Sequence, residues 1–226
     1  MPKPKVKAAP PGYMWDSRMA GGGRYRHVLA DGRLGKMISV KDIAAQSQQI
    51  ADGLSDRLAY LAQQAVEDKI TPAFFQQAMK SELRNAYNAN AALGKGGVNQ
   101  MTAVEWGRNG GLLQSEYQHL AKFAQDIADG KLTVAQAQAR ARLYGGKAYS
   151  RYTDEDARRK RESGEYTQER WGPTVGDDVV CHTRDGVLGC FERAAMGWQP
   201  LGTHPVVAGG FTPCLGNCRC PPLSFR

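Results

Sequence analysis

The spacing of hydrophobic and polar positions divides the chain into three parts. From residue 39 onward, apolar residues recur every three or four positions, which is the spacing of one face of an α-helix. This spacing is absent before residue 39 and fades after residue 170. We therefore predict a mainly α protein with an extended N-terminal arm (1–38), a helical domain (39–170) and a small, irregular, Cys-rich C-terminal module (171–226).

Capping signals within the helical domain predict four helices. The first runs to about Asp68, the second ends at the glycine-rich turn 94–97, and the third closes at Gly130. A hydroxyl side chain suited to cap a helix precedes each one, and Pro72 then stands at the first position of the second helix. The four capping residues are Ser39, Thr71, Thr102 and Thr133.

Two glycine pairs and one charged stretch modify this pattern. Gly110-Gly111 interrupts the third helical segment and Gly145-Gly146 the fourth. Because a glycine inside a helix costs roughly 1 kcal/mol relative to alanine, each pair indicates a break or a close packing contact. Residues 154–170 are almost wholly charged or polar, and we interpret them as a solvated helix end followed by a linker.

The N-terminal arm mixes proline, lysine and glycine. Its opening "MPKPKVKAAPPGYMW" favours an extended, polyproline-like backbone. The following "AGGGRYRHVLADGRLG" has too little apolar surface to order by itself. The arm is thus either a free tail or a segment that orders against neighbouring subunits.

The balance of charge is basic, with a formal net charge of +8 and a sequence pI near 9.3. This balance favours a polyanionic neighbour such as DNA or an acidic protein surface. The densest basic run consists of Arg158, Arg159, Lys160 and Arg161. We regard it as a candidate DNA contact, with a solvated helix face as the alternative.

The hydropathy of the chain gives no reason to expect a membrane partner. Mean hydropathy is −0.51, and no apolar run approaches the roughly 20 residues of a membrane helix. The N-terminus is charged and lacks the apolar core of a signal peptide. We expect synthesis in the cytosol.

All five cysteines lie in the last fifth of the chain. In a cytosolic protein, such clustering indicates metal binding or reduced core thiols before disulfides. Zinc takes four soft ligands, often delivered as two close pairs by turns. We predict a zinc site formed by Cys181, Cys190, Cys214 and Cys218, with Cys220, His182 and His204 as alternate ligands. The alternatives are buried thiols and a disulfide formed in oxidising surroundings.

The remaining motifs do not indicate an enzyme. The turn-rich segment 198–205 is expected to pack as a core segment anchored by Trp198. A nucleophile–base pair would require Cys181 with His182, or a cysteine close to His204, and no third orienting group stands at a recognisable spacing. The glycines of 94–97 lack the spacing of a phosphate-binding loop. We therefore predict no catalytic residue.

The C-terminal segment "CHTRDGVLGCFERAAMGWQPLGTHPVVAGGFTPCLGNCRC" resembles the end of Mu F-like phage minor head proteins. Asn217-Cys218-Arg219-Cys220 is similar to the terminal motif of that family, and Cys190 to its upstream cysteine. The preceding "SEYQHLAKFAQDIADGKLTVAQAQARARLYGGKAYSRY" also resembles the helices before this motif, so the resemblance covers roughly residues 102–226. Cys181 and Cys190 stand farther apart than the common Cys-x-x-Cys pair, and Cys214 occurs near the place of a frequent histidine.

This resemblance implies a structural protein of the phage head. It implies a low-copy component of the head interior or portal vertex, made in the host cytoplasm. Its partners would be the portal or major capsid protein, further copies of itself and packaged DNA. The alternative is a zinc-binding, nucleic-acid-binding protein or an assembly factor that the particle does not retain. Such a protein would bind stoichiometric metal and would show salt-dependent DNA affinity.

Overall fold

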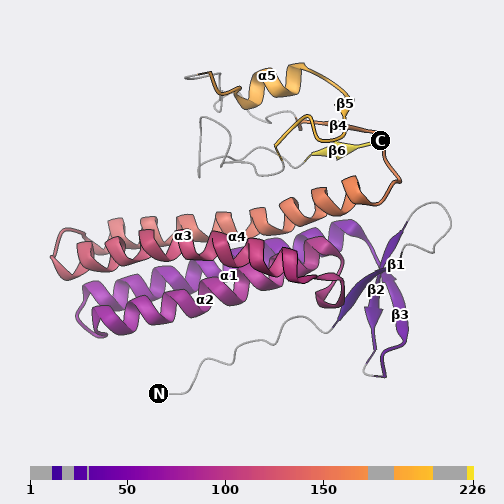
Figure 1. Cartoon of the computed structure of the whole chain (residues 1–226). Helices are drawn as coiled ribbons and strands as arrows, with labels where there is room; N and C mark the ends of the chain where they lie inside the picture. The colour runs from indigo at the N-terminus through magenta and orange to yellow at the C-terminus, as the bar shows by residue number, and fades with distance from the viewer. Residues whose placement is uncertain (1–11, 17–22, 30, 173–185, 206–222) are drawn as a thin grey trace.

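The protein is mainly helical, as predicted. The computed structural model describes residues 12–16, 23–29, 31–172, 186–205 and 223–226. Four long helices lie side by side, a three-stranded sheet stands at one end of them, and a small C-terminal module lies along α4 (Figure 1). No helix in these described ranges is long and apolar enough to span a membrane.

The four long helices begin where the sequence predicts. They are α1 (Val40–Val66), α2 (Pro72–Lys95), α3 (Ala103–Ala128) and α4 (Val134–Glu162), with the short 3-10 turn η1 (Val98–Gln100) between α2 and α3. Each predicted cap accepts a hydrogen bond from a backbone N–H of the first turn, which satisfies a donor that has no partner within the helix. The caps are Ser39, Thr71, Thr102 and Thr133.

The glycine pairs do not break the helices. Both α3 and α4 continue through their pairs, so the predicted interruptions were wrong. Gly110 and Gly111 face open space, whereas Gly145 is a close packing contact. A Cβ at Gly145 would lie 2.7 Å from the carbonyl oxygen of Ala51 in α1.

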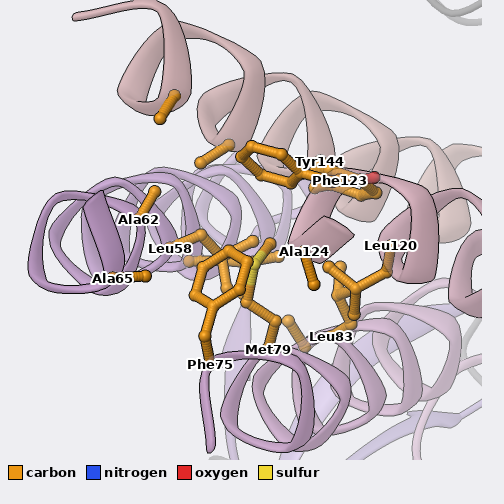
Figure 2. Packing of buried hydrophobic residues seen from close by; sticks show 14 of the residues in the cluster. Leu58, Ala62, Ala65, Phe75, Met79, Leu83, Leu120, Phe123, Ala124 and Tyr144 are labelled. Atoms are coloured by element: carbon orange, nitrogen blue, oxygen red, sulfur yellow. The ribbon is translucent and has the colours of Figure 1, made fainter. Parts of the chain in front are cut away.

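The main core lies between α1, α2, α3 and α4. Figure 2 shows Phe75 and Met79 of α2 reaching toward Phe123 of α3, with Tyr144 of α4 beside Phe123. The rings of Phe75 and Phe123 meet edge to face, with 5.4 Å between their centroids. This geometry is favourable for aromatic pairs, and it fixes α2 against α3 near the end of the bundle that is remote from the sheet (Figures 1 and 2).

Outside this core, α3 and α4 are joined by three ion pairs that follow their antiparallel course. Arg140 pairs with Asp126 at 2.7 Å and Lys147 with Glu116 at 3.1 Å. In the third pair, Arg108 Nη1 lies 3.0 Å from Glu155 Oε1. Here α3 supplies the basic residue and α4 the acidic one, the reverse of the first two pairs. The pairs therefore set the register of the two helices.

Part of the predicted arm is a folded sheet. Strands β1 (Tyr13–Asp16), β2 (Arg24–Val28) and β3 (Leu34–Ile38) pair antiparallel in the order β1-β2-β3. Tyr25 is fully buried against the helices, and its hydroxyl donates to the Leu93 carbonyl at 2.8 Å. The prediction of irregular chain was thus wrong for these strands. The apolar surface that the segment lacks is supplied by the helices of the same chain, while residues 1–11 lie outside the described ranges.

The C-terminal module is built on a small antiparallel sheet. Strand β4 (Gln168–Arg170) lies between β5 (Gln199–Pro200) and β6 (Ser224–Phe225). The short helix α5 (Cys190–Ala195) carries Cys190 into an apolar cluster with Trp171 and Leu223. Ala157 of α4 belongs to the same cluster, so the module is attached to the helical body by packing as well as by the chain.

Candidate functional site

The charged end of α4 is buried, which corrects the prediction of a solvated helix end and linker. The helix extends to Glu162. Five of its charged side chains are each less than a tenth exposed, because the N-terminal sheet, α2, α3 and the C-terminal module surround this end of the helix. These residues are Arg151, Asp154, Glu155, Asp156 and Arg159.

Arg159 joins this end of α4 to the N-terminal sheet. Its guanidinium carbon lies 3.7 Å from the centroid of the Trp15 ring and 5.6 Å from that of Tyr25. Its Nε donates to the carbonyl of Gly94 at 3.3 Å, and its Nη2 pairs with Asp156 at 2.5 Å. A desolvated cation over an aromatic ring is attracted by the partial negative charge on the face of the ring, which comes from its quadrupole. Arg159 is thus a structural link between α4, α2 and the sheet.

The predicted basic run does not form one surface. Successive residues of a helix point about 100° apart, so four consecutive side chains leave α4 in four directions. Lys160 pairs with Asp156 at 2.6 Å and lies over the ring of Phe225. Arg159 and Arg161 are also engaged within the chain, and Arg158 lines a cleft. This placement favours structural roles for the run and leaves the proposed DNA contact without a common binding face.

Arg161 joins α4 to the C-terminal module through Glu169. The Glu169 carboxylate is fully buried and accepts from Arg161 Nε at 2.7 Å and Nη2 at 2.8 Å. Its Oε1 also accepts from the backbone N–H of His204 at 2.8 Å, and Arg161 donates to the His204 carbonyl at 2.7 Å. The bidentate geometry makes this a strong, directional contact. It holds β4 and the loop after β5 against α4.

Two of the predicted metal ligands fall within the described residues, and both are buried. Cys190 is fully buried, and His204 packs its ring 5.8 Å from that of Trp171, measured between centroids. Burial lowers the pKa of His204, against the opposing effect of Glu169, and thereby favours the neutral imidazole. Neither imidazole nitrogen has a hydrogen-bond partner in the described part of the chain. A buried neutral imidazole with free nitrogens fits the role of a metal ligand.

The described residues do not by themselves form a complete metal site. Across the described ranges, no three histidine, cysteine, aspartate or glutamate side chains are grouped to hold an ion. The other predicted ligands all lie outside the described residues, and the zinc prediction therefore stays a prediction. They are Cys181, His182, Cys214, Cys218 and Cys220.

A cleft opens between α3 and α4, next to the buried charges. It has a volume of about 320 Å³ and a floor formed partly by Ala91 of α2. Its α3 side carries Arg108 and Asn109 together with apolar Leu112. Its α4 side carries four charged side chains, namely Arg151, Asp154, Glu155 and Arg158.

Several polar atoms of the residues that line this cleft make no hydrogen bond within the described part of the chain. Both carboxylate oxygens of Asp154, Nε of Arg151, Nε of Arg158 and Oδ1 of Asn109 make no hydrogen bond to any described residue. Arg151 Nη2 lies 3.1 Å from Asp154 Oδ2, so this pair is an ion pair without a well-aligned hydrogen bond. Burial raises the pKa of Asp154 to about 7, although Arg151 and Arg158 act in the opposite direction. A buried polar group without a partner is costly, and such groups around a cleft indicate a place for a ligand.

Comparison with known proteins identifies no relative. No family model matches the chain, and neither a curated protein nor a solved structure is similar to it at a significant level. Function is therefore inferred from the residues of this chain.

Sequence reasoning missed the buried end of α4, although one signal was present. The buried face 141, 145, 148, 152 continues in helical spacing to 156 and 159, where charged residues replace small and aromatic ones. No glycine or proline stands between Gly146 and Gly164. The helix could thus be extended from the sequence, but the partners of its charged groups could not.

Proposed function

We propose that this protein is a structural component of a bacteriophage head, a minor head protein that acts in head assembly or in portal-region interactions. The observation that carries the proposal is the C-terminal motif Asn217-Cys218-Arg219-Cys220 with the upstream Cys190, preceded by helices of the type found before this motif. The partners we propose are the portal or major capsid protein and further copies of this chain, with packaged DNA as a possible neighbour in the head interior. The protein would be made in the host cytoplasm.

The way the described parts are joined supports a mechanical role. Arg159 ties the sheet to α4, and Arg161 with Glu169 ties the C-terminal module to the same helix. Buried charged pairs have strict geometric requirements, so they favour one relative placement of sheet, bundle and module. A subunit that must present a fixed surface to its neighbours requires such a placement.

Quantitative mass spectrometry of purified particles tests the proposal. The measurement is the number of copies of this chain per particle, relative to the major capsid protein. We expect a low, fixed copy number, on the order of a dozen or fewer, because a portal vertex offers few equivalent positions. Absence from particles purified from cells that produce the chain would contradict the proposal and would favour a non-virion assembly factor.

We further propose that a zinc ion is bound by Cys181, Cys190, Cys214 and Cys218, with Cys220, His182 and His204 as alternates. This site is supported by the buried Cys190 and by the imidazole of His204, whose nitrogens make no hydrogen bond to any described residue. A closed site of this kind supplies folding free energy rather than chemistry. Such a role suits a module whose described apolar cluster is small.

Cys218→Ser is expected to unfold the module and leave the helices intact. Limited proteolysis should then cut within 171–226 while the fragment that contains 39–162 resists, and a zinc chelator should reproduce the pattern in the wild-type chain. Met196→Ser changes an exposed residue of the same module and serves as the control. If neither the variant nor the chelator changes the proteolysis or thermal stability of the module, the zinc site is contradicted.

A further inference from the structure

We propose that the cleft between α3 and α4 is a binding site for a carboxylate, the side chain of a glutamate or aspartate on a partner protein. The site does not depend on the phage-head proposal. It rests on the buried polar atoms beside the cleft that make no hydrogen bond within the described residues, and on the charge of their side chains.

Two arginines that line the cleft each carry a buried Nε–H group that makes no hydrogen bond to any described residue. Nε of Arg151 and Nε of Arg158 come from α4 at positions seven residues apart, which lie on the same face of a helix. Arg151 is only 7% exposed, so its unused donor does not face open solvent. Arginine is the side chain best suited to planar carboxylate recognition.

The charge of the cleft also favours an anion. It carries three arginines against Glu155 and Asp154, and Glu155 already accepts from Arg108 at 3.0 and 3.3 Å. Burial lowers the pKa of Arg158, and the positive charge of Arg108 lowers it further. An anion placed beside Arg158 would relieve this repulsion.

Asp154 selects a carboxylate because it can share a proton with one. The side chain is 4% exposed, and neither oxygen makes a hydrogen bond within the described residues. In its protonated form, a carboxyl group donates one strong hydrogen bond to an incoming carboxylate. The groups that face Asp154 are Arg151, Glu155 and Arg158 of α4, Arg108 of α3 and Tyr87 of α2.

The shape of the cleft favours a single side chain over a nucleic-acid backbone. Its volume of about 320 Å³ is at the small end of ligand pockets. A phosphodiester chain would place repeated negative charges near Glu155, whereas a single carboxylate side chain brings only one. Leu112 is 37% exposed beside the cleft and gives an apolar contact for the stem of a glutamate.

The test is a titration of the full chain, followed by NMR of the arginine Nε–Hε signals. The probe is N-acetyl-glutamate N-methylamide, the matched neutral probe is the glutamine analogue, and dimethyl phosphate represents a nucleic-acid backbone. We expect the glutamate probe to shift the signals of Arg151 and Arg158, and the neutral probe to leave them unchanged. Equal or stronger shifts with dimethyl phosphate, or no shift with the glutamate probe, would overturn the proposal.

The pH dependence tests the role of Asp154. With a pKa of about 7, its carboxyl is mostly protonated at pH 6 and mostly ionised at pH 8. The ionised form repels a carboxylate, so binding should be about tenfold weaker at pH 8 than at pH 6. Asp154→Asn keeps a donor at both pH values, and its affinity for the probe should not change between them. If Asp154→Asn binds the probe with the same pH dependence as the wild-type chain, Asp154 does not take part in binding.

Two arginine variants compare the loss of probe affinity when a charge is removed from the cleft with the loss when a charge is removed from the exposed surface. Arg158→Gln should reduce binding of the glutamate probe at least tenfold, because it removes the charge and the free Nε donor. Arg142→Gln removes an exposed charge of the same helix and should change binding less than twofold. Equal losses in the two variants would show non-specific attraction and would overturn the proposal. The wild-type titration decides the question even if Arg158→Gln does not fold.

Discussion

Arg159→Ala should lower the free energy of unfolding by about 3 kcal/mol, the lower end of the range for removing one partner of a buried ion pair. The substitution removes the guanidinium from the faces of Trp15 and Tyr25 and leaves the Gly94 carbonyl without this donor. Asp156 keeps its pair with Lys160, which limits the loss. Urea denaturation of the full chain is the measurement.

Two further variants separate the geometry of Arg159 from its charge. Arg159→Lys keeps a cation but lacks the planar fork that stacks on Trp15 and reaches Asp156, so its stability should fall between wild type and Arg159→Ala. Arg142→Ala, at an exposed position of α4, should change stability by no more than about 0.5 kcal/mol. Similar losses for Arg142→Ala and Arg159→Ala would contradict the structural role of the buried guanidinium.

Gly145→Ala and Gly146→Ala should change stability in opposite directions, although the two glycines are adjacent in α4. A methyl group at Gly145 would meet Ser55 Oγ and the Ala51 carbonyl of α1, and a backbone atom cannot move without displacing its helix. We expect a loss of about 2–3 kcal/mol, as for an overpacked core. A methyl group at Gly146 meets nothing within 4 Å, so it should stabilise the helix by about 0.5–1 kcal/mol.

The comparison of these glycine variants is made by thermal or urea unfolding of the full chain. Gly94→Ala provides an independent test of the same principle, since its Cβ would lie against the Tyr152 carbonyl of α4. It should destabilise the protein about as much as Gly145→Ala. If all three variants are stabilising, α1, α2 and α4 do not pack as closely as described here.

Local signals determined most of the helical body. The hydroxyl of each capping residue and the apolar residues at three- and four-residue spacing depend on the chain nearby, so the four helix starts could be predicted. The role of each glycine pair was harder to predict from sequence, because glycine destabilises a helix by a similar amount whether or not another helix packs against it. Only the positions of Ala51 and Ser55 on the neighbouring helix α1 distinguish Gly145 from Gly146.

The candidate cleft and the buried end of α4 depend on tertiary structure. Sequence alone determined that the protein is mainly helical, where its four long helices begin, and that its cysteines gather at the C-terminus. It could not show that Tyr25, Leu93 and Tyr152 meet in one cluster, since they are far apart along the chain. Charged residues are normally exposed, and they are buried here because distant segments supply their partners. Those partners, and the unused donors beside Asp154, were decided by the packing of α3, α4 and the N-terminal sheet.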